Sequence, residues 1–164
     1  MSFRKWMSTS MAHDSRVCAH IFGKIPASLH GWRPSPSQRS VEELARYLAI
    51  CGINPLRGFL EPGKGWREIF RSRIDSVPAE ELGAAFEQQA QEIEAYFQEI
   101  TDEQLETNSV TMPWGETMSL GQAIVYGPAK WLPSYRMQLF LYARQNDIVL
   151  STPNLWHGKD RPAT

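Results

Sequence analysis

The chain has 164 residues, of which 17 are Lys or Arg and 18 are Asp or Glu, so its formal net charge is −1. This length suits a single domain with its own core, and a near-neutral charge without a basic run disfavours nucleic acid as a partner. No apolar stretch approaches the roughly twenty residues of a membrane-spanning helix, so we expect no membrane contact. The N-terminal residues do not form a secretory signal and the two cysteines form no CxxC pair, which favours a cytoplasmic location.

Four segments show helical periodicity, which predicts an all-α fold. The first, residues 6–25, carries apolar side chains at spacings of three and four, and Asp14 interrupts this stripe. The second, residues 41–54, begins directly after Ser40, which forms the residue pair of a reciprocal capping box with Glu43 three residues later. Gly52 and Pro55 predict that this helix frays or ends close to them.

The third segment, residues 78–100, has the most regular pattern in the chain. Its apolar residues follow one another in steps of four, four, three, four and three, and acidic and amide side chains occupy the other faces. Thr101 and Gln104 then form a second capping pair, and an extended strap follows at residues 110–115. The predicted apolar stripe comprises Leu82, Phe86, Ala90, Ile93, Phe97 and Ile100.

The fourth segment, residues 120–146, begins after a third capping pair and contains two prolines. An interior proline costs a helix roughly 3 kcal/mol, so Pro128 and Pro133 predict a kink or local break near residues 126–133. The predicted stripe of this helix comprises Leu120, Ile124, Trp131, Tyr135, Gln138 and Tyr142.

Segregated apolar stripes on four helices predict one four-helix-bundle domain over residues 1–164. The connection at residues 60–77, with one expected helical turn at 66–70, is long enough to span a bundle, so the helices on either side of it can run parallel. We expect the tail, residues 148–164, to be irregular.

Two segments resemble proteins of the DinB/YfiT family. The loop and second helix of that family are similar to residues 32–49, which read WRPSPSQRSVEELARYLA. The family pattern H-x-x-x-H-R-x-Q-L-x-x-Y-x-R is similar to residues 131–144, which read WLPSYRMQLFLYAR. The resemblance covers roughly residues 5–150. It implies a four-helix bundle with up-down-down-up topology and long connections.

The resemblance also implies a set of site residues. Metal-binding members of the family hold a divalent ion with one histidine on the second helix and two on the fourth, and the matching residues here are Tyr47, Trp131 and Tyr135. An indole has no lone pair for a metal and a phenol has a pKa near 10, so we expect no metal and no cofactor at these positions. Arg136 and Gln138 keep the family pattern. The three aromatic rings either fill the former cavity or, with Arg136 and Gln138, line a remodelled pocket for a small organic ligand.

The sequence therefore favours a metal-free DinB-like protein of unknown role that binds a small molecule or a protein partner. The alternative is a thiol- or small-molecule-dependent enzyme of the transferase or hydrolase type, with a metal site shifted to His13 and His20. A third possibility is a structural homodimer. The residues alone do not decide whether the chain is catalytic.

Overall fold

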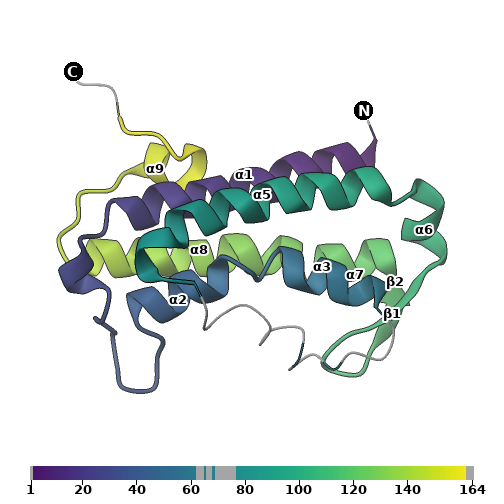
Figure 1. The fold of residues 1–164 in the computed structure, drawn as a ribbon, viewed down its shortest axis with the longest axis horizontal. Helices are drawn as coiled ribbons and strands as arrows, with labels where there is room; N and C mark the ends of the chain where they lie inside the picture. The colour runs from purple at the N-terminus through teal and green to yellow at the C-terminus, as the bar shows by residue number, and fades with distance from the viewer. Residues whose placement is uncertain (1, 62–64, 66–67, 69–76, 162–164) are drawn as a thin grey trace.

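The computed structural model describes residues 2–61, 65, 68 and 77–161. α1 runs in one direction (Figure 1). The pair α2 and α3 runs in the opposite direction, as does α5, and the pair α7 and α8 runs in the direction of α1. The bundle thus has the up-down-down-up order that the resemblance implies. The bundle helices are α1 (Phe3–Gly23), α2 (Val41–Leu48), α3 (Ile53–Leu60), α5 (Leu82–Glu99), α7 (Leu120–Tyr126) and α8 (Pro128–Gln145).

Short elements connect and close the bundle. A 3₁₀ turn, η1 (Ala27–Leu29), follows α1, and η2 (Ala79–Glu81) leads into α5. At the far end of α5, α6 (Asp102–Thr107) precedes a hairpin of β1 (Ser109–Thr111) and β2 (Thr117–Ser119), in which Val110 pairs with Met118 (Figure 1). The predicted strap is one strand of this hairpin with its turn. The expected turn at residues 66–70 lies outside the described residues except for Glu68.

The three predicted capping boxes are present. The hydroxyl groups of Ser40, Thr101 and Ser119 each accept a hydrogen bond from the backbone N–H three residues later, and the side chain at that later position accepts one from the cap N–H. These bonds satisfy N–H groups that a helix start leaves free, which explains why α2, α6 and α7 begin where they do.

The predicted apolar face of residues 78–100 is confirmed. All six residues of its stripe are buried, and Phe86, Ala90 and Ile93 have no exposed surface. The helix itself begins at Leu82, because the first turn of the predicted segment is the 3₁₀ turn η2. α5 packs along α1 and also contacts α2 and α3, so it supplies one wall of the core.

The predicted helix over residues 41–54 is two helices, because the chain leaves the helical path after Leu48 and resumes it at Ile53. Gly52 lies in this break, where a Cβ atom would come within 2.7 Å of Leu132 Cδ1. A side chain at this position would therefore push α8 or its neighbours away. Pro55 lies in the first turn of α3, where a missing backbone N–H is tolerated, so it is compatible with a helix that starts at Ile53.

One buried amide holds the break between α2 and α3. The Gln89 side-chain oxygen accepts hydrogen bonds from the backbone N–H of Gly52 at 2.9 Å and of Ile53 at 3.3 Å. Its nitrogen donates to the Leu48 carbonyl oxygen at 2.9 Å and to Ser15 Oγ at 2.8 Å. The Gln89 amide thus replaces part of the missing helical hydrogen bonding and ties α5 to α1 and to the α2–α3 break.

The fourth predicted helix is also divided, within the range where the prolines predicted a kink. The break is at Gly127, where a Cβ atom would lie 2.8 Å from the Ala123 carbonyl oxygen. Pro128 is the first residue of α8, a position at which the missing N–H costs little, and α8 continues through Pro133. The break changes which side of the helix faces the core, so the predicted stripe is wrong beyond it except at Tyr142, which is buried. The other buried residues there include Leu132, Arg136, Leu139 and Ala143, whereas Trp131, Tyr135 and Gln138 are half-buried.

Two further boundaries differ from the sequence prediction. α1 begins at Phe3 and ends at Gly23, rather than spanning residues 6–25. The tail at residues 148–164 contains a helix, α9 (Thr152–His157), because Ser151 and Asn154 form a capping box and a proline occupies the first turn. Within the described ranges, no helix is both long and apolar enough to cross a lipid bilayer.

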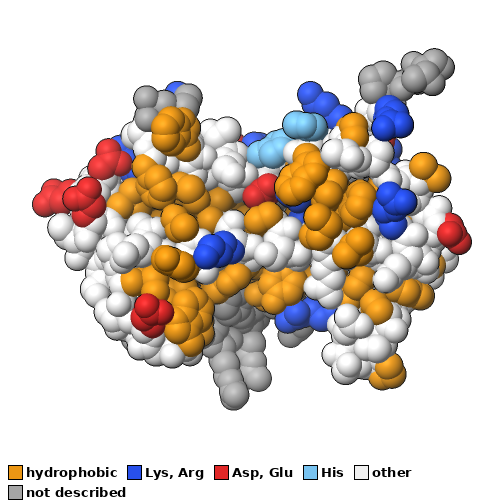
Figure 2. All heavy atoms as spheres, turned by 180° about the vertical axis from the view of Figure 1, so that it is seen from behind, with side chains coloured by type: hydrophobic (Ala, Val, Ile, Leu, Met, Phe, Trp, Pro, Cys, Tyr) orange, Lys and Arg blue, Asp and Glu red, His pale blue; other side chains and the backbone are white. Residues whose placement is uncertain are grey.

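Exposed apolar side chains are numerous on the face turned away in Figure 1. Figure 2 shows that hydrophobic side chains gather there in broad areas with few charges between them. Over the whole molecule, the large exposed apolar side chains include Trp6, Trp114, Tyr126, Leu141 and Trp156.

Candidate functional site

The second and fourth bundle helices bring two of the predicted site residues together. Tyr47 lies on α2 and Tyr135 on α8, and their ring centroids are 4.8 Å apart with the rings inclined at 76°. This edge-to-face arrangement is favoured by the charge distribution of aromatic rings. Both side chains are half-buried, so the pair contributes to the α2–α8 contact and also reaches the surface.

An arginine that was not among the predicted site residues lies over this pair. Arg39, in the loop just before the Ser40 cap, places its guanidinium carbon 4.4 Å from the Tyr47 ring centroid and 5.8 Å from that of Tyr135. The side chain is exposed, and none of the described residues accepts a hydrogen bond from its guanidinium or forms an ion pair with it. We call Arg39, Tyr47 and Tyr135 the arginine–tyrosine platform.

The phenol of Tyr47 keeps its proton at all ordinary pH values. Burial raises its pKa well above the usual range, and a hydrogen bond to Tyr135 raises it further, while Arg39 acts in the opposite direction. The hydroxyl group of Tyr135 can both donate and accept a hydrogen bond, so it can take part in binding a polar group at the platform.

Two more predicted site residues flank the platform along α8. Trp131 lies one helical turn before Tyr135, and its ring edge packs against the chain at Gly127. Gln138 Nε2 donates to the Tyr142 hydroxyl oxygen at 2.7 Å. The structure therefore places these side chains on the two sides of Tyr135, each engaged with a neighbour of its own.

Arg136, the fifth predicted site residue, does not face the platform. It is 2% exposed, forms an ion pair with Asp14 of α1, and has its guanidinium carbon 5.1 Å from the ring centroid of Trp156 in α9. Burial raises the pKa of Asp14, although the Arg136 guanidinium opposes this shift. The Asp14–Arg136 pair joins α1 to α8 inside the bundle.

Solved structures identify the fold. No family model and no curated protein sequence matches the chain. A crystal structure of a protein from Exiguobacterium sibiricum 255-15 that is assigned to the DinB family is similar with a TM-score of 0.76 and 21% sequence identity, over 94% of this chain and 98% of that one. The fold is DinB-like. A DinB-like protein from Bacillus subtilis is similar with a TM-score of 0.70 and 14% identity, over 88% of this chain and 94% of that one.

The residues on the platform do not fit the divalent metal that a DinB-like fold can hold. The two phenols and the indole of Trp131 stand at the positions that the resemblance matches to metal-binding histidines. The indole has no lone pair to offer, and burial keeps Tyr47 protonated. The Arg39 guanidinium, 4.4 Å from the Tyr47 ring, would in addition repel a cation.

Two histidines of α1 in this DinB-like bundle, His13 and His20, contact the C-terminal segment. His13 Nε2 is 2.8 Å from the Trp156 carbonyl oxygen. His20 Nε2 is 3.0 Å from Asn154 Nδ2 and 3.6 Å from Asp160 Oδ1. Within the part of the chain that the structure describes, no group of three His, Cys, Asp or Glu side chains is placed to hold a metal ion. His13 and His20 thus contact different parts of the segment around α9 and do not converge.

Proposed function

We propose that this DinB-like protein binds a small organic anion at the arginine–tyrosine platform, without a metal. The observation that carries the proposal is the Arg39 guanidinium, which stacks on two phenol rings and has no hydrogen-bond or ion-pair partner among the described residues. The rings hold the flat guanidinium in place while its N–H groups stay at the surface.

The chemistry of the platform suits a planar carboxylate. A guanidinium can donate two parallel hydrogen bonds to one carboxylate, and such charge-assisted bonds are stronger than neutral ones. The hydroxyl group of Tyr135 adds a further hydrogen-bonding group close by. Trp131 and Gln138, on the two sides of Tyr135 along α8, would then contact the body of the ligand. Arg136 supports the site only indirectly, because its pair with Asp14 fixes α8 against α1.

Benzoate is a suitable probe because it combines a carboxylate with a flat ring. We expect titration calorimetry to show saturable benzoate binding by the full chain. Arg39→Ala should weaken binding by roughly 10- to 100-fold, as expected for the loss of a hydrogen bond between charged groups, and Tyr135→Phe should weaken it a few-fold. Arg39→Lys should resemble Arg39→Ala more than the parent, because an ammonium lacks the planar fork.

Arg33→Ala is the matched control. Arg33 is an exposed arginine of the same loop, but it pairs with Glu43 at 3.2 Å and is not part of the platform. Its removal should leave benzoate affinity unchanged. The proposal is wrong if the parent does not bind benzoate, or if the two arginine-to-alanine variants lose affinity equally.

The enzyme alternative draws no support from the protein's own thiols. Cys18 and Cys51 are both fully buried, and burial raises the pKa of each thiol well above its usual value. A thiol that is buried and protonated is a poor nucleophile and a poor metal ligand. Binding rather than thiol chemistry is therefore the function that we propose.

A further inference from the structure

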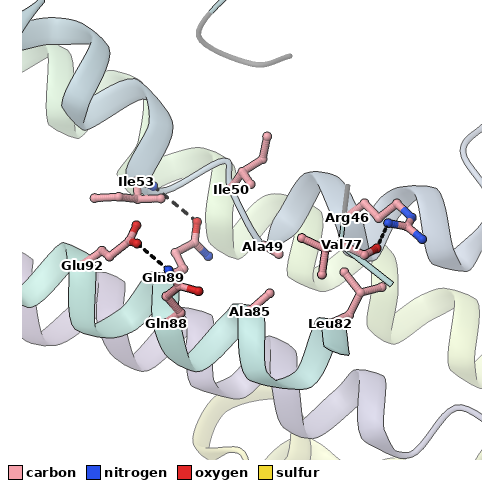
Figure 3. A pocket seen from close by; sticks show the side chains of 10 residues that line it. All are labelled: Arg46, Ala49, Ile50, Ile53, Val77, Leu82, Ala85, Gln88, Gln89 and Glu92. Carbon is pink, nitrogen blue, oxygen red and sulfur yellow. Dashed lines mark hydrogen bonds between the residues drawn. The ribbon is translucent and has the colours of Figure 1, made fainter. Parts of the chain in front are cut away.

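A cavity of about 190 Å³ lies between α2–α3 and the first half of α5 (Figure 3). Its inner wall is apolar, since Ala49, Ile53 and Leu82 are buried there and Ala85 is half-buried. The break between α2 and α3 and the short alanine side chains leave a space that larger residues would fill. The cavity and the platform share no residue.

The charged groups at the rim are already neutralised. Arg46 pairs with Glu42 at 2.6 Å, and Glu92 pairs with Arg57 at 3.3 Å. An ionic ligand would therefore have to compete with an existing ion pair at either end. A neutral ligand avoids this competition.

One polar atom at the rim is available. Gln88 donates through Nε2 to Glu92 at 2.9 Å, as Figure 3 shows, while none of the described residues donates a hydrogen bond to its side-chain oxygen. The neighbouring Gln89 amide lines the cavity as well, but its nitrogen and oxygen are engaged with Ser15, Leu48 and the α2–α3 break. Gln88 is thus an acceptor for one hydroxyl or N–H of a ligand, and Gln89 is a fixed wall.

We propose that this cavity is a second binding site, which takes a small neutral molecule with one ring-sized apolar body and one hydroxyl donor, of the phenol class. The size is adequate, because an engineered apolar protein cavity of about 150 Å³ holds benzene. The apolar body occupies the space beside Ile53 and Leu82, and the hydroxyl donates to the oxygen of Gln88. This site differs from the platform in ligand charge, position and residues.

The test uses p-cresol, with toluene as the analogue that lacks the hydroxyl, and titration calorimetry on the full chain. Ala85→Leu fills the cavity with a residue that favours helix formation, and it should weaken p-cresol binding about tenfold or more. Ala84→Leu makes the same change at an exposed neighbouring position of α5 that does not line the cavity, and it should leave the affinity unchanged. Benzoate binding should be the same in both variants.

Gln88→Ala tests the polar contact at an exposed position where folding is not at risk. It should weaken p-cresol binding several-fold and leave toluene binding unchanged. The proposal is overturned if p-cresol shows no saturable binding to the parent, if Ala85→Leu binds it as tightly as the parent does, or if Ala84→Leu weakens it equally. Unchanged p-cresol affinity in Gln88→Ala would overturn the proposed hydroxyl contact.

Discussion

Two arginines lie against aromatic rings close to α8, one as a residue of that helix and one from a neighbouring loop, and their surroundings differ. Arg136 belongs to α8, is 2% exposed and lies under Trp156, with the Asp14 carboxylate as its partner. Arg39 reaches Tyr135 from the loop before α2, is exposed and has no ionic partner among the described residues. The same pairing of guanidinium and ring thus occurs once inside the protein and once at its surface.

The comparison shows how burial separates a structural arginine from one that is available to a ligand. A buried guanidinium needs an anion in direct contact to balance its charge. Arg136 therefore pairs with Asp14, and this pair joins α8 to α1. Arg39 remains hydrated, so it needs no partner and can exchange water for an anion at small cost. The resemblance drew attention to Arg136, whereas the geometry favours Arg39 as the binding residue.

The largest expected effect is that of Asp14→Ala. Removal of one partner of a buried ion pair leaves the other charge uncompensated, so we expect a loss of about 3–5 kcal/mol in the free energy of unfolding, measured with urea. Asp102→Ala is the control, because Asp102 pairs with Arg4 at the surface and its removal should cost at most about 1 kcal/mol. Equal losses in the two variants would remove the contrast between buried and exposed arginine pairs.

Trp156→Ala should have a smaller effect. It removes the ring over Arg136 and admits water to the Asp14–Arg136 pair. We expect the free energy of unfolding to fall by about 1–2 kcal/mol. Trp6→Ala removes a tryptophan that is 60% exposed, and it should change stability by less than about 0.5 kcal/mol. Urea unfolding of both variants measures the difference, and a Trp156→Ala protein as stable as Trp6→Ala would show that the ring does not shield the pair.

Arg39→Ala should have a still smaller effect on stability. The guanidinium over Tyr47 and Tyr135 is exposed to water, where a cation–π contact is worth about 0.5–1 kcal/mol. Its removal should therefore reduce ligand binding far more than it reduces stability. A loss of several kcal/mol in urea unfolding would instead make Arg39 a structural residue like Arg136.

The smallest effect concerns the segment that carries Trp156. A hydrogen bond from Lys24 lowers the pKa of Asp160, so the ionised carboxylate stabilises the docked segment. This stabilisation is complete above the ordinary Asp pKa of about 3.9 and is lost as pH falls through the lowered pKa of Asp160. The NMR signal of the Trp156 indole N–H should report a loosening in this acid range. Asp160→Asn should remove that pH step, and a step of the same size in the variant would assign it to another group.

The sequence predicted elements well where one helix runs without a break. In α5 the helical period holds from Leu82 to Phe97, so every residue assigned to the apolar stripe is buried. In the last helical segment, Gly127 interrupts the helix and changes its phase, so a pattern carried across the break selected Trp131 and Tyr135 instead of Leu132 and its neighbours. Periodicity predicts a buried face only within one continuous helix.

The candidate site was predictable in part. The resemblance brought Tyr47 and Tyr135 together correctly, because it carries information about how helices pack. Arg39 stands in the segment that carries the resemblance, but it was not assigned to the site, because its contact with α8 depends on the path of a loop that periodicity does not predict. Asp14 gave a signal that was not used: a carboxylate within an apolar stripe requires a buried cation, and Arg136 was already a candidate residue.

The Gln89 amide has a consequence for how the molecule opens. The amide hydrogens of Gly52 and Ile53 lie in a break between helices, where exchange with solvent is usually fast, but they are bonded to a buried side chain that also binds Ser15 of α1 and the Leu48 carbonyl. These hydrogens can exchange only when α1, α5 and the break separate together, which is close to global unfolding. Their exchange should therefore be as slow as that of the centre of α5, while the short α9, held mainly by contacts at the surface of α1, exchanges through local opening. The interruption in α2–α3 is in this sense part of the slowest-exchanging unit of the protein.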